Sequence, residues 1–166
     1  DPYRSLNPRQ TVGRAIAEGP MNYGLGRVEA TARASNLLSL VGLDPKALSR
    51  YPHQFSGGQR QRICIARALA MEPDVLVADE PVSALDVSVQ AQVLELLKDL
   101  QAKFELAILF ITHDLRVAAQ VSDNIAVMYQ GNIVEHGPTE VIFQSPKHEY
   151  TKRLFNAAPG KEWSFS

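Results

Sequence analysis

The residues with the clearest chemical potential form the segment Phe55-Ser56-Gly57-Gly58-Gln59, which opens an expected helix. The first backbone N–H groups of a helix have no partner within it, and the helix dipole adds positive potential at that end. Glycines let an anion approach the backbone closely, and the side chains of Ser56 and Gln59 can add hydrogen bonds. This segment therefore predicts a phosphate site. The ordinary alternative is a capped surface helix, since a serine followed by two glycines is common in loops.

Two carboxylates, Asp79 and Glu80, follow the apolar run Val75–Ala78. Such a run suits a parallel strand buried on both faces, and the carboxyl ends of parallel strands line the crevice where open α/β sheets bind ligands. In nucleotide hydrolysis an acid at this edge holds Mg²⁺, and a neighbouring acid orients or deprotonates the attacking water. We assign the metal role to Asp79 and the water role to Glu80. The alternative is a simple turn or helix start.

A histidine, His113, follows the second all-apolar run, Leu106–Ile111. Parallel neighbours share their carboxyl edge, so His113 is expected at the same crevice as Glu80. An imidazole there would hydrogen-bond a γ-phosphate and fix the water. The other histidines fall in loops or at edges, where a solvated side chain is the ordinary interpretation.

Hydrophobic periodicity predicts the elements that position these groups. The pattern predicts a strand at Val75–Ala78, a helix at Val87–Phe104 and a second strand at Leu106–Ile111, which together form a βαβ unit with a right-handed crossover. Asp86 is expected to cap the helix of this unit. Gly19-Pro20 is expected to stop an earlier helix. The remaining pattern predicts helices at about 11–18, 27–41, 57–71 and from 115, a hairpin of 125–129 with 133–135, and helical turns at 139–143 and 149–155. The predicted domains are a helical part at 1–71, an α/β part at 72–145 and a C-terminal extension at 146–166.

Composition narrows the class of protein. The 166 residues, 45% of them hydrophobic, suffice for one sizeable core, and a net charge of −1 gives no bulk positive field for nucleic acid or anionic lipid. The single cysteine, Cys64, excludes an internal disulfide framework and a thiolate metal cluster. No apolar run approaches the roughly 20 residues that a membrane-spanning helix needs. Any phosphate must therefore be bound by local geometry.

Taken together, these segments resemble the motifs of ABC-type ATPases. Phe55 to Gln59 is similar to the family's signature motif, with Phe in place of the commoner Leu, and Val75 to Glu80 resembles its Walker B strand. Ser83 to Asp86 resembles the D-loop, and His113 the switch histidine. The flanks are similar to the ATP-binding subunits of dipeptide and oligopeptide importers at residues 1–9, 51–54 and 145–151.

The resemblance implies an α/β fold, namely the Walker B side of a P-loop NTPase-type parallel sheet with a helical subdomain. The family's Walker A loop, G-x-x-x-x-G-K-[ST], has no match here, because Leu25-Gly26 follows the glycine pair Gly19 and Gly24. The chain is thus expected to be the C-terminal portion of a nucleotide-binding domain, cut just after the Q-loop glutamine. By itself it is expected neither to bind ATP tightly nor to hydrolyse it.

The resemblance also implies a mechanism and partners. Two such domains pair head to tail, so Ser56, Gly57, Gly58 and Gln59 would touch ATP held by a partner chain, with Asp86 at the dimer seam. Asp79, through Mg²⁺, and the catalytic pair Glu80 and His113 would serve ATP held by their own domain. The expected partners are a second ABC ATPase subunit, transmembrane permease subunits and, indirectly, a solute-binding protein. Such ATPases lie on the cytoplasmic, inner face of the plasma membrane.

Two other functions remain open from the sequence. One is a non-catalytic interaction module that keeps the helical subdomain and dimer seam. The other is an ABC ATPase that works on DNA or ribosomes, which the near-neutral charge, Gln59 and the importer-like flanks disfavour. The solute stays open as well, because dipeptide, oligopeptide, glutathione-like peptide and nickel carriers are all compatible.

Overall fold

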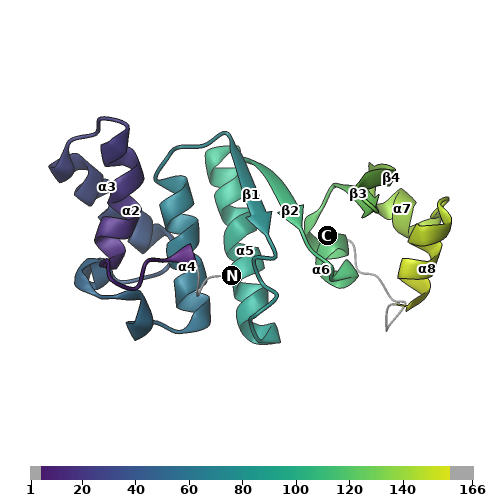
Figure 1. The fold of residues 1–166 in the computed structure, drawn as a ribbon, viewed down its shortest axis with the longest axis horizontal. Helices are drawn as coiled ribbons and strands as arrows, with labels where there is room; N and C mark the ends of the chain where they lie inside the picture. Colours follow the sequence, from purple (N-terminus) through teal and green to yellow (C-terminus); the bar gives the residue numbers. More distant parts are fainter. Residues whose placement is uncertain (1–4, 158–166) are drawn as a thin grey trace. The chain divides into compact units, whose positions relative to one another are not determined.

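The computed structural model describes residues 5–157, so the ends of the importer-like N-terminal flank and of the predicted extension lie outside the described residues. The chain forms two compact units, which divide between Leu109 and Phe110. Figure 1 colours the elements in chain order. The two units are described in turn.

The first unit begins with helices that pack on one another. They are α2 (Val12–Asn22), α3 (Arg27–Leu40), 3₁₀ turns at Pro45–Ser49 and Pro52–Gln54, and α4 (Gly57–Leu69). Their shared core contains fully buried aliphatic side chains, among them Ile16, Leu38 and Ile63. On α4 the apolar side chains of Ile63, Ala66 and Leu69 are buried, whereas Val28 at the start of α3 is exposed.

The prediction that Gly19-Pro20 stops α2 is wrong, because the helix continues through both residues to Asn22. Gly19 serves packing here: a Cβ on it would lie 2.5 Å from the Met71 sulfur. Pro20 is buried in the last turn of the helix. A proline this close to a helix end removes few helical hydrogen bonds, so the chain tolerates it.

The α/β part of the first unit contains β1 (Val75–Asp79), α5 (Val87–Phe104) and the start of β2 (Ala107–Ile111). The two strands are hydrogen-bonded neighbours, and the Ala107 N–H donates to the carbonyl oxygen of Asp74 at 3.0 Å. The beginnings of the strands therefore lie together, as in a parallel pair joined by a crossover helix. This confirms the predicted strand, helix and strand order.

Strand β1 differs from the prediction of burial on both faces. Leu76 and Ala78 are buried, but Val75 and Val77 on the other face are 56% and 59% exposed. Within residues 5–109, the described part of the first unit, no element covers that face of β1. An all-apolar strand is buried on both faces only where other elements cover both faces of its sheet.

The second unit contains α6 (Leu115–Val121), β3 (Asn124–Tyr129), β4 (Asn132–Pro138), α7 (Thr139–Gln144) and α8 (Glu149–Ala157). The predicted hairpin is confirmed: β3 and β4 pair antiparallel, and Gln130 and Gly131 both have positive φ at the turn. The core of this unit includes the rings of Phe143 and Phe155, which stack with centroids 4.5 Å apart. Among the described residues, no helix has both the length and the apolar character needed to cross a membrane.

One carboxylate ties α8 to the hairpin. Glu135 in β4 accepts hydrogen bonds from the backbone N–H groups of Lys147 (2.8 Å) and His148 (3.0 Å), just before α8. The rings of Tyr129 in β3 and Tyr150 in α8 also stack, with centroids 4.1 Å apart. Glu135 therefore fixes the segment that leads into α8.

This contact predicts a pH dependence. Burial opposes ionisation of Glu135, but the hydrogen bonds that the carboxylate accepts, those from the backbone N–H groups of Lys147 and His148 among them, hold the pKa of this carboxyl below its usual range. A lowered folded-state pKa contributes stability above the unfolded pKa of about 4.3, and the contribution is lost as the pH falls through the folded value. We expect Glu135→Gln to be less stable than the wild type at pH 7 by about 1 kcal/mol or less, because the group is solvated. The difference should vanish at low pH.

Urea denaturation midpoints across pH 3–7 measure this difference. Glu95→Gln, on the exposed face of α5, is the control and should follow the wild-type profile. Parallel profiles for wild type and Glu135→Gln over the whole range would contradict the role given to Glu135.

Candidate functional site

The glycine-rich segment forms the first turn of α4. Ser56 is the N-cap residue, and its hydroxyl oxygen accepts the Gln59 backbone N–H at 3.4 Å. The Gln59 side-chain oxygen in turn accepts the Ser56 backbone N–H at 3.1 Å, which completes a capping box. Among the described residues, the amides of Gly57 and Gly58 have no acceptor. These two N–H groups, with the Ser56 hydroxyl and the side-chain NH₂ of Gln59, are the donors that this turn can offer an anion.

The residues before the turn hold it in place. Phe55 is buried, and the Arg50 guanidinium lies over its ring at 4.4 Å from the centroid. Arg50 also donates to the Gln54 carbonyl oxygen at 2.6 Å, and Arg60 donates to the Phe55 carbonyl oxygen at 3.0 Å. The turn is therefore anchored on both sides of Ser56. The sequence analysis did not identify Arg50 or Arg60, and cation–π and side chain to carbonyl contacts leave no simple spacing signal.

The structure brings the start of α4 together with the start of α5. Gly58 is buried against Val89, and a Cβ on Gly58 would lie 2.3 Å from a Val89 methyl carbon. One turn earlier Asp86 caps α5, as predicted, with its carboxylate accepting the Val89 N–H at 3.0 Å. Ser56 to Gln59 and Asp86 thus occupy two adjoining helix starts. Both Ser56 and Asp86 are exposed.

The predicted acidic pair lies at the end of β1. Asp79 is exposed, and among the described residues none donates a hydrogen bond to its carboxylate. Glu80 is half-buried and has the left-handed backbone conformation, with φ +48°, which is unfavourable for a residue with a side chain. The Ser83 backbone N–H (3.4 Å) and hydroxyl (3.2 Å) both donate to the Glu80 carbonyl oxygen and hold this turn. Strained turns of this kind often occur at functional sites.

The carboxylate of Asp79 fits a magnesium ion. Mg²⁺ is usually held by one or two carboxylates, with water and substrate phosphate oxygens completing its octahedron. An exposed carboxylate with no competing donor meets that requirement. The described residues contain no group of three or more acidic, histidine or cysteine side chains that could hold a metal by themselves, so most ligands here would come from phosphate and water.

His113 follows β2 in the second unit and is exposed. The next residues form a fixed helix start: the Asp114 N–H donates to the Thr112 hydroxyl at 3.0 Å, and the Asp114 carboxylate accepts the Arg116 N–H at 2.9 Å. The predicted pairing of His113 with Glu80 joins the two units and stays a prediction.

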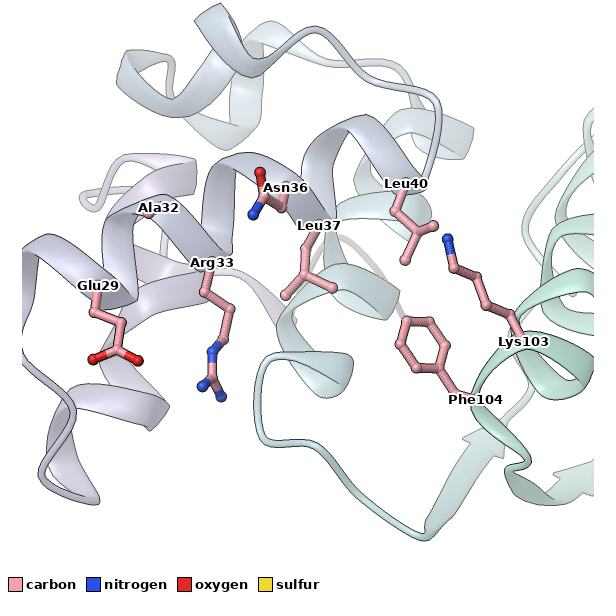
Figure 2. A pocket seen from close by; sticks show the side chains of 8 residues that line it. All are labelled: Glu29, Ala32, Arg33, Asn36, Leu37, Leu40, Lys103 and Phe104. Atoms are coloured by element: carbon pink, nitrogen blue, oxygen red, sulfur yellow. The ribbon is translucent and has the colours of Figure 1, made fainter.

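A separate groove of about 440 Å³ lies between α3 and the end of α5 (Figure 2). Leu37 and Leu40 line one side and Phe104 the other, with Lys103 at the rim. Arg33 in this groove is engaged by Glu72 at 3.1 Å. None of the predicted site residues lines it, so the candidate site remains at the starts of α4 and α5 and at the end of β1.

Comparison with known proteins adds to this geometry. Residues 3–83 match the family described as "ABC transporter". The chain is 56% identical over 160 residues to the glutathione import ATP-binding protein GsiA of Salmonella choleraesuis, which covers 96% of this chain and 26% of that protein. GsiA of Pectobacterium atrosepticum is 54% identical over the same length, and GsiA of Escherichia coli K12 is 55% identical over 164 residues.

A solved structure is also similar. CbiO1 from Clostridium perfringens, described as part of the ABC transporter complex CbiONQ, superimposes with a TM-score of 0.77 at 29% identity, over 96% of this chain and 62% of that one. The chain spans about a quarter of the length of the curated relatives it matches. The family match ends at Ser83, whereas the alignments with GsiA cover nearly the whole chain.

Proposed function

We propose that this chain, whose residues 3–83 match the ABC transporter family, forms the signature and Walker B part of an ATPase that drives import of glutathione or a similar small peptide. The similarity to GsiA, 56% over 160 residues, is the observation that carries the proposal. It supports this importer class over an ATPase that works on nucleic acid, as does the net charge of −1.

At the start of α4, the proposed action is recognition of a γ-phosphate. The amides of Gly57 and Gly58 and the Ser56 hydroxyl donate to phosphate oxygens of ATP held by a partner domain, and the Gln59 side chain adds its amide. Because the capping box keeps Ser56 and Gln59 in place, these donors need little rearrangement. Asp86, on the adjoining helix start, lies at the seam between the two domains.

At the end of β1, the proposed action is hydrolysis of ATP held by the chain's own domain. Asp79 would hold Mg²⁺, which neutralises the charge that develops on the phosphate oxygens. Glu80 takes the proton of a water whose oxygen attacks the γ-phosphorus, and the bond to ADP breaks. His113 donates a hydrogen bond to the γ-phosphate and keeps it in line with the water.

The whole protein's assembly is part of the proposal. A second ABC ATPase domain completes each ATP site, and a Walker A loop supplies the β-phosphate contacts. Permease subunits in the membrane receive the closing motion, with a solute-binding protein on the far side. The ATPase then lies on the cytoplasmic face of the membrane. The present 166 residues alone are proposed to be inactive, since they contain no Walker A match.

A charge substitution at Ser56 tests the phosphate contact. Aspartate is as good an N-cap as serine, so Ser56→Asp should keep α4 folded while its carboxylate repels the γ-phosphate. We expect ATP turnover by the full-length protein to fall by about tenfold or more, which corresponds to loss of one charge-assisted hydrogen bond plus the added repulsion. Phosphate release at saturating MgATP is the measurement.

Ser56→Asn is the matched control, because it caps the helix with a neutral side chain of the same shape. It loses the hydroxyl bond to the phosphate but adds no negative charge, so it should be slower than the wild type and several-fold faster than Ser56→Asp. Equal rates for the aspartate and asparagine variants would show that no phosphate approaches Ser56 and would count against the proposed function.

A further inference from the structure

One arginine on α4 bridges three helices of the first unit. Arg62 donates from one guanidinium nitrogen to the carbonyl oxygen of Val41 at 2.9 Å, at the end of α3. Its other terminal nitrogen donates to the side-chain oxygen of Gln92 in α5 at 3.4 Å. The end of α3 leaves carbonyl oxygens without helical partners, and Arg62 satisfies one of them.

The chain after α3 is shaped to admit this guanidinium. Gly42 has φ +75°, and a Cβ on it would lie 3.0 Å from the Arg62 nitrogen that donates to Val41. Any other residue at position 42 would suffer backbone strain and would crowd the guanidinium. The position of the Arg62 guanidinium therefore depends on a glycine at position 42.

The contact also fixes how α4 lies along α5. Gly58 meets Val89, and four residues later Arg62 meets Gln92, three residues beyond Val89. Positions four apart on one helix thus face positions three apart on the other, which is ordinary ridge-into-groove packing. Sliding or rotating α4 would break the Arg62 to Gln92 bond and press Gly58 into Val89.

The other two arginines of α4 donate to carbonyl oxygens elsewhere in the first unit. Arg60 donates to the carbonyl oxygen of Phe55 at the start of α4, and Arg67 donates to that of Ser5. Arg62, in contrast, donates a hydrogen bond to α5. It lies one turn behind the donors of Ser56 to Gln59.

We propose that Arg62 is a positioning residue for ATP turnover, and that it acts by holding the phosphate-binding start of α4 in register with the Asp86 end of α5. The inference rests on the proposed function. ATP first binds to its own domain, and the start of α4 meets that ATP only when two domains close. If α4 loses its alignment with α5, hydrolysis in the closed pair of domains therefore slows and kcat falls, while KM for ATP changes little.

The test compares variants of the full-length protein with its membrane subunits. Gln92→Ala removes an exposed side chain and leaves Arg62 bonded to Val41, so the protein stays folded. We expect it to lower kcat about threefold to tenfold, with KM within about twofold and the melting temperature nearly unchanged. Arg62→Lys, whose single ammonium cannot span both acceptors, should behave in the same way.

The double variant Arg62→Ala with Gln92→Ala should be no slower than Arg62→Ala alone, since both substitutions remove one interaction. Lys98→Ala, an exposed cation on the same helix α5, is the control and should have wild-type kcat. Wild-type kcat in both Gln92→Ala and Arg62→Lys would overturn the inference. So would a fall in kcat of the double variant that equals the product of the falls in the two single variants. Absence of turnover in the wild type itself would overturn the proposed function instead.

Discussion

Glu80→Gln in the full-length protein is expected to abolish ATP turnover and to leave ATP binding intact. Glutamine has the shape of glutamate but cannot take a proton from water at neutral pH, and a positioned base contributes about 10²- to 10⁴-fold to such a reaction. Asp79, the proposed magnesium ligand, is unchanged in the variant. Phosphate release measures turnover, and equilibrium binding of a fluorescent ATP analogue measures affinity.

The backbone at Glu80 gives this prediction a structural control. The residue lies in a strained turn with φ +48°, which the Ser83 contacts hold through the Glu80 carbonyl oxygen. Glutamine should keep that turn. Glu95→Gln, on the exposed face of α5, should have the wild-type rate. Wild-type turnover by Glu80→Gln would exclude Glu80 as the base.

Gly58→Ala is expected to destabilise the protein by about 3 kcal/mol, at the upper end of overpacking costs. Alanine normally stabilises a helix interior relative to glycine by about 1 kcal/mol, so destabilisation would be contrary to helix propensity. The cause is the Val89 methyl carbon, 2.3 Å from where the new Cβ would be. The start of α4 must then move away from α5, and ATP turnover should fall as well.

A compensating substitution separates this clash from other causes. Val89→Ala removes the methyl group that the Cβ of Gly58→Ala would meet, so the double variant should recover most of the lost stability. Val89→Ala alone should cost about 1 kcal/mol, because Val89 is only partly buried. The midpoint of urea denaturation is the measurement. The close approach of the two helices would be contradicted if the double variant were as unstable as Gly58→Ala, or if Gly58→Ala alone had wild-type stability.

The sequence predicted the elements whose periodicity is local. The helix Val87–Phe104 was predicted at its observed bounds, with Asp86 as its cap, and the hairpin of 125–129 with 133–135 was predicted as well. Capping boxes, apolar runs and turn pairs each depend on a few neighbouring residues. Prediction therefore placed the glycine-rich turn and the acidic pair on the correct kinds of element.

Contacts between distant residues could not be predicted in the same way. Gly19 was interpreted as a helix stop, but its role is to admit Met71, which is 52 positions away in the chain. Gly58 was interpreted only as part of an anion site, although it also packs on Val89. Arg62 has no distinguishing spacing at all, since its acceptors lie on α3 and α5. Only the packed structure brings these partners together.

The central claim is that Ser56 touches the γ-phosphate of ATP, and vanadate trapping tests it most directly. With MgADP, orthovanadate occupies the γ-phosphate position in the full-length protein, and ultraviolet light then cleaves the chain at residues in contact with the vanadate. The account predicts cleavage at Ser56, dependent on Mg²⁺ and lost in Ser56→Asp. Trapped vanadate that cleaves the protein elsewhere but never at Ser56 would contradict it.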